Sequence, residues 1–124
     1  MITFDKLKIV TKIKDITEID TTVFVTQTKD GKILYYKYKQ ESPFSLMIQA
    51  DLNNQELVIE FTGKILKEDY SQLINRNNIV KCLETINDIG ICKIDHDAIL
   101  AHGEVYKCDV TKDISSTQMQ GIIS

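Results

Sequence analysis

Apolar and polar residues alternate along the first part of the chain. In residues 4–14, FDKLKIVTKIK, the apolar Leu7, Ile9 and Ile13 are separated by lysines. A period of two with β-branched residues is typical of a half-buried strand, so the sequence predicts one here with its lysines on the solvent side. These lysines are Lys6, Lys8, Lys12 and Lys14. Residues 15–20, DITEID, are predicted to form a short connection.

Two hairpins are predicted to follow. Residues 21–40 hold two strand-like runs around Asp30 and Gly31, a pair that suits a tight turn because glycine tolerates a positive φ angle. Residues 44–66 form the second hairpin, with aspartate and asparagine supplying its turn. Pro43 separates the two, since proline has no N–H to donate to a ladder.

Helical spacing appears in the second half of the chain. One apolar stripe at intervals of three and four predicts an amphipathic helix, and its members are Leu66, Tyr70, Leu73 and Ile74. A second helix is predicted to begin after Asn78 and to end at Gly90, a residue suited to a left-handed cap. Residues 91–94 are predicted to be a strand, and Asp95 is predicted to cap a short turn after it.

Residues 104–114 are predicted to be the final strand, so strands precede and follow the helices. This order predicts a single α+β domain over residues 1–124: a mainly antiparallel sheet of five to seven strands with one or two helices packed on one face. That domain either stands alone or is the N-terminal domain of a longer protein.

Composition narrows the functional classes. The net charge of −3 argues against a uniformly basic nucleic-acid binder, although residues 1–39 carry eight lysines against five acidic residues. No apolar run approaches the roughly 20 residues of a membrane span, and the first residues lack the order of a signal peptide. We therefore expect a cytoplasmic protein without membrane association. The three cysteines are too far apart for a zinc site, so Cys82, Cys92 and Cys108 are predicted to be free buried thiols.

Lysines give the clearest candidate binding surface. Like charges repeated on one strand face repel one another, which indicates an anionic partner or protection of a sheet edge. In YYKYK, Tyr36 and Tyr38 are predicted to share one face, and Tyr35, Lys37 and Lys39 the other. This pattern fits either ordinary amphipathic packing or a nucleic-acid platform. The candidate DNA-binding residues are Lys6, Lys8, Lys12, Lys14, Lys37 and Lys39, and the candidate partner is single- or double-stranded DNA.

Two carboxylates of the last predicted strand raise the question of a metal. Asp109 and Asp113 would lie about 13 Å apart on a regular strand, too far to bind one ion directly. They either lie on the solvent-exposed face of a sheet or belong to a site that residues from elsewhere complete. Asp95 and His96 are the candidates for those further residues. The sequence names no cofactor with certainty; a divalent ion, Mn²⁺ or Mg²⁺, is the candidate, and Asp109 and Asp113 are its candidate ligands. No catalytic residue is assigned.

Three segments resemble a known family. ELVIEFTGKIL, INDIGICKID and VYKCDVTKDI, within residues 56–114, resemble the N-terminal region of phage and plasmid replication-initiation proteins of the Bacteroidetes mobile-element type. In that family a strand of the form L-x-I-E-x-[ST]-G-K precedes helices, and a later strand carries two aspartates. Here the later strand contains Asp109 and Asp113.

The resemblance implies a DNA-contacting domain of a mobile element. Such initiators nick one DNA strand with a tyrosine nucleophile, a divalent metal and, in many, a His-hydrophobic-His pair. This chain lacks that pair, so either the catalytic tyrosine lies outside it or the protein has lost catalysis. We therefore expect a replication-initiator-like domain that is not catalytically complete on its own. The alternative is a non-enzymatic module that meets a protein partner, or a second copy, through its sheet face or an edge strand.

Overall fold

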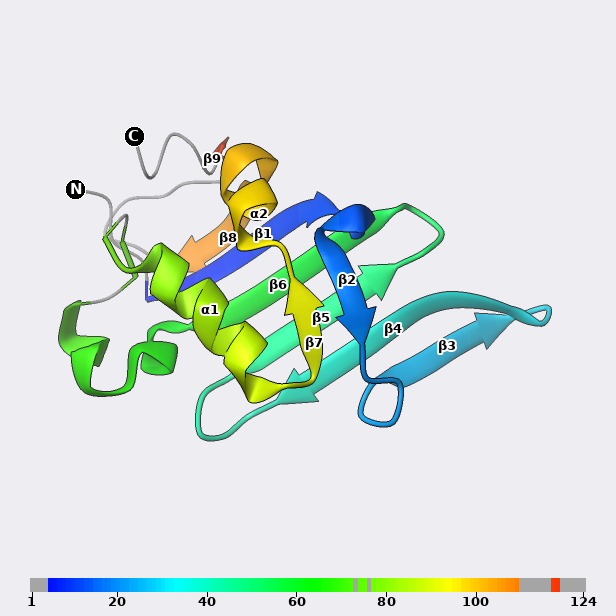
Figure 1. The fold of residues 1–124 in the computed structure, drawn as a ribbon, viewed down its shortest axis with the longest axis horizontal. Helices are drawn as coiled ribbons and strands as arrows, with labels where there is room; N and C mark the ends of the chain where they lie inside the picture. Colours follow the sequence, from blue (N-terminus) through cyan, green and yellow to red (C-terminus); the bar gives the residue numbers. More distant parts are fainter. Residues whose placement is uncertain (1–4, 73, 76, 110–116, 119–124) are drawn as a thin grey trace.

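A computed structural model describes residues 5–72, 74–75, 77–109 and 117–118 of the chain. Within them, antiparallel strands form one large sheet in the order β3-β4-β5-β6-β1-β8-β9, and a small second sheet pairs β2 with β7 (Figure 1). The large sheet consists of β1 (Lys6–Lys12), β3 (Val25–Lys29), β4 (Lys32–Gln40), β5 (Leu46–Asp51), β6 (Glu56–Thr62), β8 (Glu104–Asp109) and β9 (Thr117–Gln118). The small sheet consists of β2 (Ile16–Ile19) and β7 (Cys92–Ile94).

Period-two alternation places one row of each central strand in the core. Ile9 of β1 pairs with Ile59 of β6, which pairs in turn with Ile48 of β5, and all three side chains are fully buried. Leu7 pairs with the buried Phe61 in the same way. Because alternate side chains point to opposite faces, the intervening polar residues of these strands are turned to the other side of the sheet.

Helices and the small sheet cover this apolar face. Figure 1 shows α1 (Ile79–Ile89), α2 (His96–His102) and the β2–β7 pair lying on the same side of the large sheet. Ile79, Leu83 and Ile86 of α1 are buried in the common core. Among the described residues, the opposite face of the large sheet carries no helix or strand, and we call it the open face. The predicted α+β class is confirmed.

Both predicted hairpins form, and so does the second predicted helix. Asp30 and Gly31 adopt φ angles of 53° and 78° at the turn between β3 and β4. Gly90 ends α1 with a φ of 85°. Asp95 caps α2 by accepting a hydrogen bond from the Ala98 amide at 3.2 Å. Asn78 precedes α1 but makes no cap with its side chain, which accepts instead from the amide of Asn75.

Three local predictions were wrong. Residues 15–20 are not a plain connection, because Ile16–Ile19 is β2 and pairs with β7. The first predicted helix is a 3₁₀ run, Gly63–Gln72, broken where Lys67 has a φ of 56°. A positive φ interrupts helical hydrogen bonding, so the spacing of apolar residues alone overstated this helix. The first strand ends at Lys12, and Ile13–Asp15 is a 3₁₀ turn that contains Lys14.

Candidate functional site

The lysines of β1 lie on the open face. Lys6, Lys8 and Lys12 alternate with the buried Leu7, Ile9 and Thr11. Lys14 belongs to the 3₁₀ turn after the strand, so it does not continue this row. We call Lys6, Lys8 and Lys12 the β1 lysines.

Acidic residues stand opposite the β1 lysines. Lys8 pairs across the sheet with Glu60 of β6, and Lys12 pairs with Glu56 of the same strand. The ammonium nitrogen of Lys6 lies 2.8 Å from Oε1 of Glu60. Opposite charges on facing positions of neighbouring strands stabilise a sheet, so β6 supplies balancing charge to this row. On the β8 side Lys6 pairs with Asp109, whereas Lys8 pairs with Lys107. The acids of β6 therefore relieve part of the repulsion along β1 without an external anion.

The lysines of the β3–β4 hairpin have different neighbours. Lys37 faces Gln49 on one side and Val25 on the other, and Lys39 faces Met47. Lys29 and Lys32 stand directly opposite one another beside the turn. We call Lys29, Lys32, Lys37 and Lys39 the hairpin lysines. Lys39 alone of them makes an ion pair within the described part of the chain, at 3.7 Å to the exposed Glu41.

The hairpin is anchored at one end and open at the other. Phe24, which is 4% exposed, packs its ring against Tyr38 with centroids 5.7 Å apart, and Tyr38 and Tyr36 contact the core. The hydroxyl of Tyr38 donates to Gln40 at 2.7 Å. All five residues of β3 are exposed, and the turn of the hairpin reaches beyond the neighbouring strands (Figure 1). The sequence prediction that Tyr36 and Tyr38 share one face is confirmed, and this face is the one that contacts the core.

The structure describes one of the two predicted metal ligands, Asp109, and only its backbone. Asp109 ends β8, where it pairs with Lys6 of β1, and Asp113 lies outside the described residues. Asp95 caps α2, and Nδ1 of His96 lies 3.2 Å from a carboxylate oxygen of the exposed Asp97. Within the part of the chain that the structure describes, no group of three or more His, Cys, Asp or Glu residues could hold a metal ion.

A buried carboxylate that sequence reasoning missed joins β1 to α2. Asp15 is 2% exposed, and its Oδ2 lies 2.6 Å from the hydroxyl oxygen of Thr11 and 2.6 Å from Nε2 of His102. A carboxylate only accepts hydrogen bonds, so both neighbours donate to it. Asp15 and His102 are 87 positions apart in the chain. No local pattern in the sequence could have joined them.

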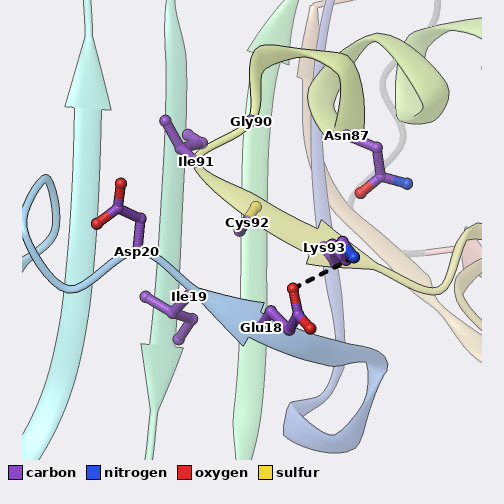
Figure 2. A pocket seen from close by; sticks show the side chains of 8 residues that line it. All are labelled: Glu18, Ile19, Asp20, Asn87, Gly90, Ile91, Cys92 and Lys93. Carbon is purple, nitrogen blue, oxygen red and sulfur yellow. Dashed lines mark ion pairs between the residues drawn. The ribbon is translucent and has the colours of Figure 1, made fainter.

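Two shallow cavities flank these elements. One of about 220 Å³ lies where the small sheet meets the end of α1 (Figure 2). Its rim holds the exposed pair Glu18 and Lys93, 3.4 Å apart, and the side chain of Asn87 bonds both backbone groups of Ile94. The other, also about 220 Å³, lies beside His102 and Glu56. Both are smaller than the roughly 300–1,000 Å³ of ordinary small-molecule sites.

Burial makes the described cysteines unreactive. Cys82 and Cys92 are free and buried, as predicted, whereas the side chain of Cys108 lies outside the described part. Burial raises the pKa of Cys82 to about 12 and that of Cys92 to about 11. The thiolate is the nucleophilic form, so neither residue is suited to covalent catalysis near neutral pH.

Comparisons with protein-family models, with curated proteins and with solved structures find no match to this chain. Among the described residues, no helix has the length and apolar character that crossing a membrane requires. The candidate functional surface therefore rests on the geometry of the sheet alone. On the open face, the β1 lysines lie opposite acids of β6, whereas the hairpin lysines have no acid at the facing strand positions.

Proposed function

We propose that the protein binds DNA through the β3–β4 hairpin. The observation that carries the proposal is the contrast between the two groups of lysines on the large sheet. The β1 lysines stand opposite Glu56 and Glu60, whereas Lys29 and Lys32 stand opposite each other and Lys37 stands between two uncharged residues. Lysines without an acid at the facing position of a neighbouring strand are the ones that gain most from contact with phosphates.

The shape of the hairpin supports the same partner. A two-stranded β-ribbon fits the major groove of DNA, which is about 12 Å wide. The exposed side chains of β3 are mainly Thr and Gln, which can hydrogen-bond to phosphates or to base edges. Tyr35 shares the face of Lys37 and could stack on an unpaired base of single-stranded DNA.

The resemblance to replication-initiation proteins gives this proposal a biological direction. A domain of that kind would position DNA of a mobile element for a nicking site supplied elsewhere. The described residues supply neither a metal cluster nor a pair of adjacent histidines, so DNA contact is the part of that activity proposed for this chain.

Fluorescence anisotropy with labelled single- and double-stranded oligonucleotides of equal length tests the proposal. The logarithm of the binding constant should fall linearly with the logarithm of salt concentration, with a slope of about −0.9 per duplex phosphate contacted. The double variant Lys29→Ala/Lys32→Ala should reduce that slope by roughly two, since it removes two contacts.

The matched control is Lys8→Ala/Lys12→Ala, which removes the same charge from the same face of the sheet. It should change the slope much less, because those lysines face acids. Equal losses in the two variants would show that DNA responds to net charge rather than to the hairpin. The absence of measurable binding at low salt would overturn the proposal.

A second candidate function is protein–protein interaction, and one observation favours it. β3 is the edge strand of the large sheet, and its Val25 is 68% exposed. An exposed edge strand can accept a further strand through its free backbone groups. The salt dependence separates the two functions, because strand addition does not weaken steeply with salt as phosphate contact does.

A further inference from the structure

The two edges of the large sheet are protected to different degrees. Within the described residues, β9 at one edge is two residues long, and short edge strands are one way in which proteins avoid unwanted pairing. β3 at the other edge has five residues, and Val25–Thr28 carries neither charge nor proline. The irregularity in this hairpin places its extra residue, Leu34, on β4, so β3 itself advances regularly.

β3 is already held in the conformation that a pairing strand needs. Its partner β4 fixes it on one side. The buried Phe24, the residue immediately before β3, anchors the start of the strand. Three of its residues, Val25, Thr26 and Thr28, are β-branched and favour extended backbone. Because the strand is ordered beforehand, a partner strand would not have to offset the entropy of ordering it.

We propose that β3 pairs antiparallel with β3 of a second copy of this chain, about a two-fold axis at Gln27. In this arrangement Gln27 of one copy lies opposite Gln27 of the other. Thr26 lies opposite Thr28, and Val25 lies opposite Lys29. The two large sheets become one continuous sheet, and both open faces lie on the same side of it.

Charge and side-chain pairing select this register. It matches all five residues of β3, and it places two Thr–Thr pairs across the strands, a favourable combination. Sliding the strands to place Lys29 opposite Lys29 would set like charges face to face, which is destabilising. In the proposed register Lys29 of one copy and Lys37 of the other are two strands apart, about 10 Å, where salt screens their repulsion.

The size of the contact sets its strength. Five residues of antiparallel strand span about 17 Å, so the interface falls below the range of stable complexes and belongs among the weak, transient ones. We therefore expect association that depends on protein concentration. Added salt should leave it unchanged or strengthen it, opposite to its effect on DNA binding. The proposal does not rest on DNA binding, and its test contains no nucleic acid.

Charge-swap variants at Gln27 test the axis directly. The protein should self-associate in sedimentation experiments between about 10 μM and 1 mM, a range suited to weak complexes. Gln27→Lys alone and Gln27→Glu alone should each lose association, because like charges meet at the axis. An equimolar mixture of the two should regain it as a heterodimer. Gln27 is exposed, so neither change should disturb the fold, which circular dichroism checks.

The matched control uses Gln49, which lies on the same face but on the inner strand β5. Gln49→Lys and Gln49→Glu should associate like the unchanged protein. A wild-type chain that stays monomeric throughout the concentration range would overturn the proposal. So would association that survives Gln27→Lys, or single variants that do not recover on mixing, because each places the contact away from Gln27.

Discussion

The lysines of β1 and those of the β3–β4 hairpin lie in two regions of the large sheet that differ in burial and in the charge of the facing residues. β1 lies between β6 and β8, with its alternate residues buried and its lysines opposite Glu56 and Glu60. β3 lies at the sheet edge with every residue exposed, and the hairpin lysines face uncharged residues or one another. The same residue type therefore serves the sheet in one region and remains available for a partner in the other.

The difference shows that the position of a strand in the sheet decides whether neighbouring strands can compensate a row of charged residues on it. A central strand has neighbours on both sides, and these can supply compensating charge at every second residue. An edge strand lacks one neighbour, so its charges either protect the edge or meet another molecule. The sequence pattern indicated the β1 lysines, Lys37 and Lys39, but neither Lys29 nor Lys32. It could not show which lysines had acids across from them.

The largest expected effect is a difference in the free energy of unfolding between a variant in β1 and a variant in β3. Ile9→Ala in β1 should lower the free energy of unfolding by about 3 kcal/mol, because it leaves a cavity in the closed core. Val25→Ala in β3 truncates a residue that is 68% exposed and should change the free energy of unfolding by less than about 0.5 kcal/mol. Urea denaturation followed by circular dichroism measures both. Similar losses in the two variants would contradict the assignment of β3 as an exposed edge.

The carboxylate after β1 should give the next largest effect. Asp15→Ala leaves the hydroxyl of Thr11 and Nε2 of His102 without their acceptor and should destabilise the protein by about 2 kcal/mol. Asp15→Asn keeps an acceptor oxygen in place, so it should cost less than Asp15→Ala if hydrogen bonding alone explains the contact. Equal destabilisation by the two variants would show that the negative charge itself is required.

Most of the fold could be predicted from residue spacing. Strands with a clean period of two, such as β1 and β5, reveal their buried face in the sequence itself. The Asp30–Gly31 turn and the Gly90 cap could be predicted from the sequence because few residues other than glycine tolerate a positive φ. The 3₁₀ run at Gly63–Gln72 could not be foreseen, since its break at Lys67 depends on tertiary context rather than on any breaker residue.

The candidate surface was only half predictable. Alternation correctly placed Lys8 and Lys37 on the outer face of their strands. Strand order could not be read from the sequence, so the acids opposite β1 and the edge position of β3 were both missed. The Asp15–His102 contact was missed for the same reason, because it depends on the packing of α2 against the end of β1.

Gly31 in the hairpin turn and Gly90 at the end of α1 both have a positive φ, so substitutions there compare the backbone of the hairpin with that of the core. A Cβ at Gly31 or Gly90 would meet no atom within 4 Å, so alanine adds only left-handed strain at either site. Gly90→Ala should lower the free energy of unfolding by about 1 kcal/mol, since α1 is part of the core. Gly31→Ala should lower it less, because the hairpin turn can open locally.

Amide hydrogen exchange distinguishes local opening from global loss in these two variants. Gly31→Ala should speed exchange in β3 and the adjoining part of β4 while leaving α1 unchanged. Uniform acceleration throughout the sheet would mean that the hairpin opens only with the whole domain, and the contrast between edge and centre would then be smaller than proposed.

The smallest effect compares one ion pair from each region. Glu60→Gln removes one acidic partner of Lys6, in a pair whose side chains are 30% and 18% exposed, and should destabilise the protein by about 0.5 kcal/mol at low salt. Glu41→Gln removes the partner of Lys39, whose pair is mostly exposed, and should have no measurable effect on stability. Raising the salt concentration should reduce the difference in stability between the two variants, because screening weakens the Lys6–Glu60 attraction. If Glu41→Gln proved the more destabilising of the two, charge on the hairpin would be balanced within the protein, and the argument for a phosphate partner there would fail.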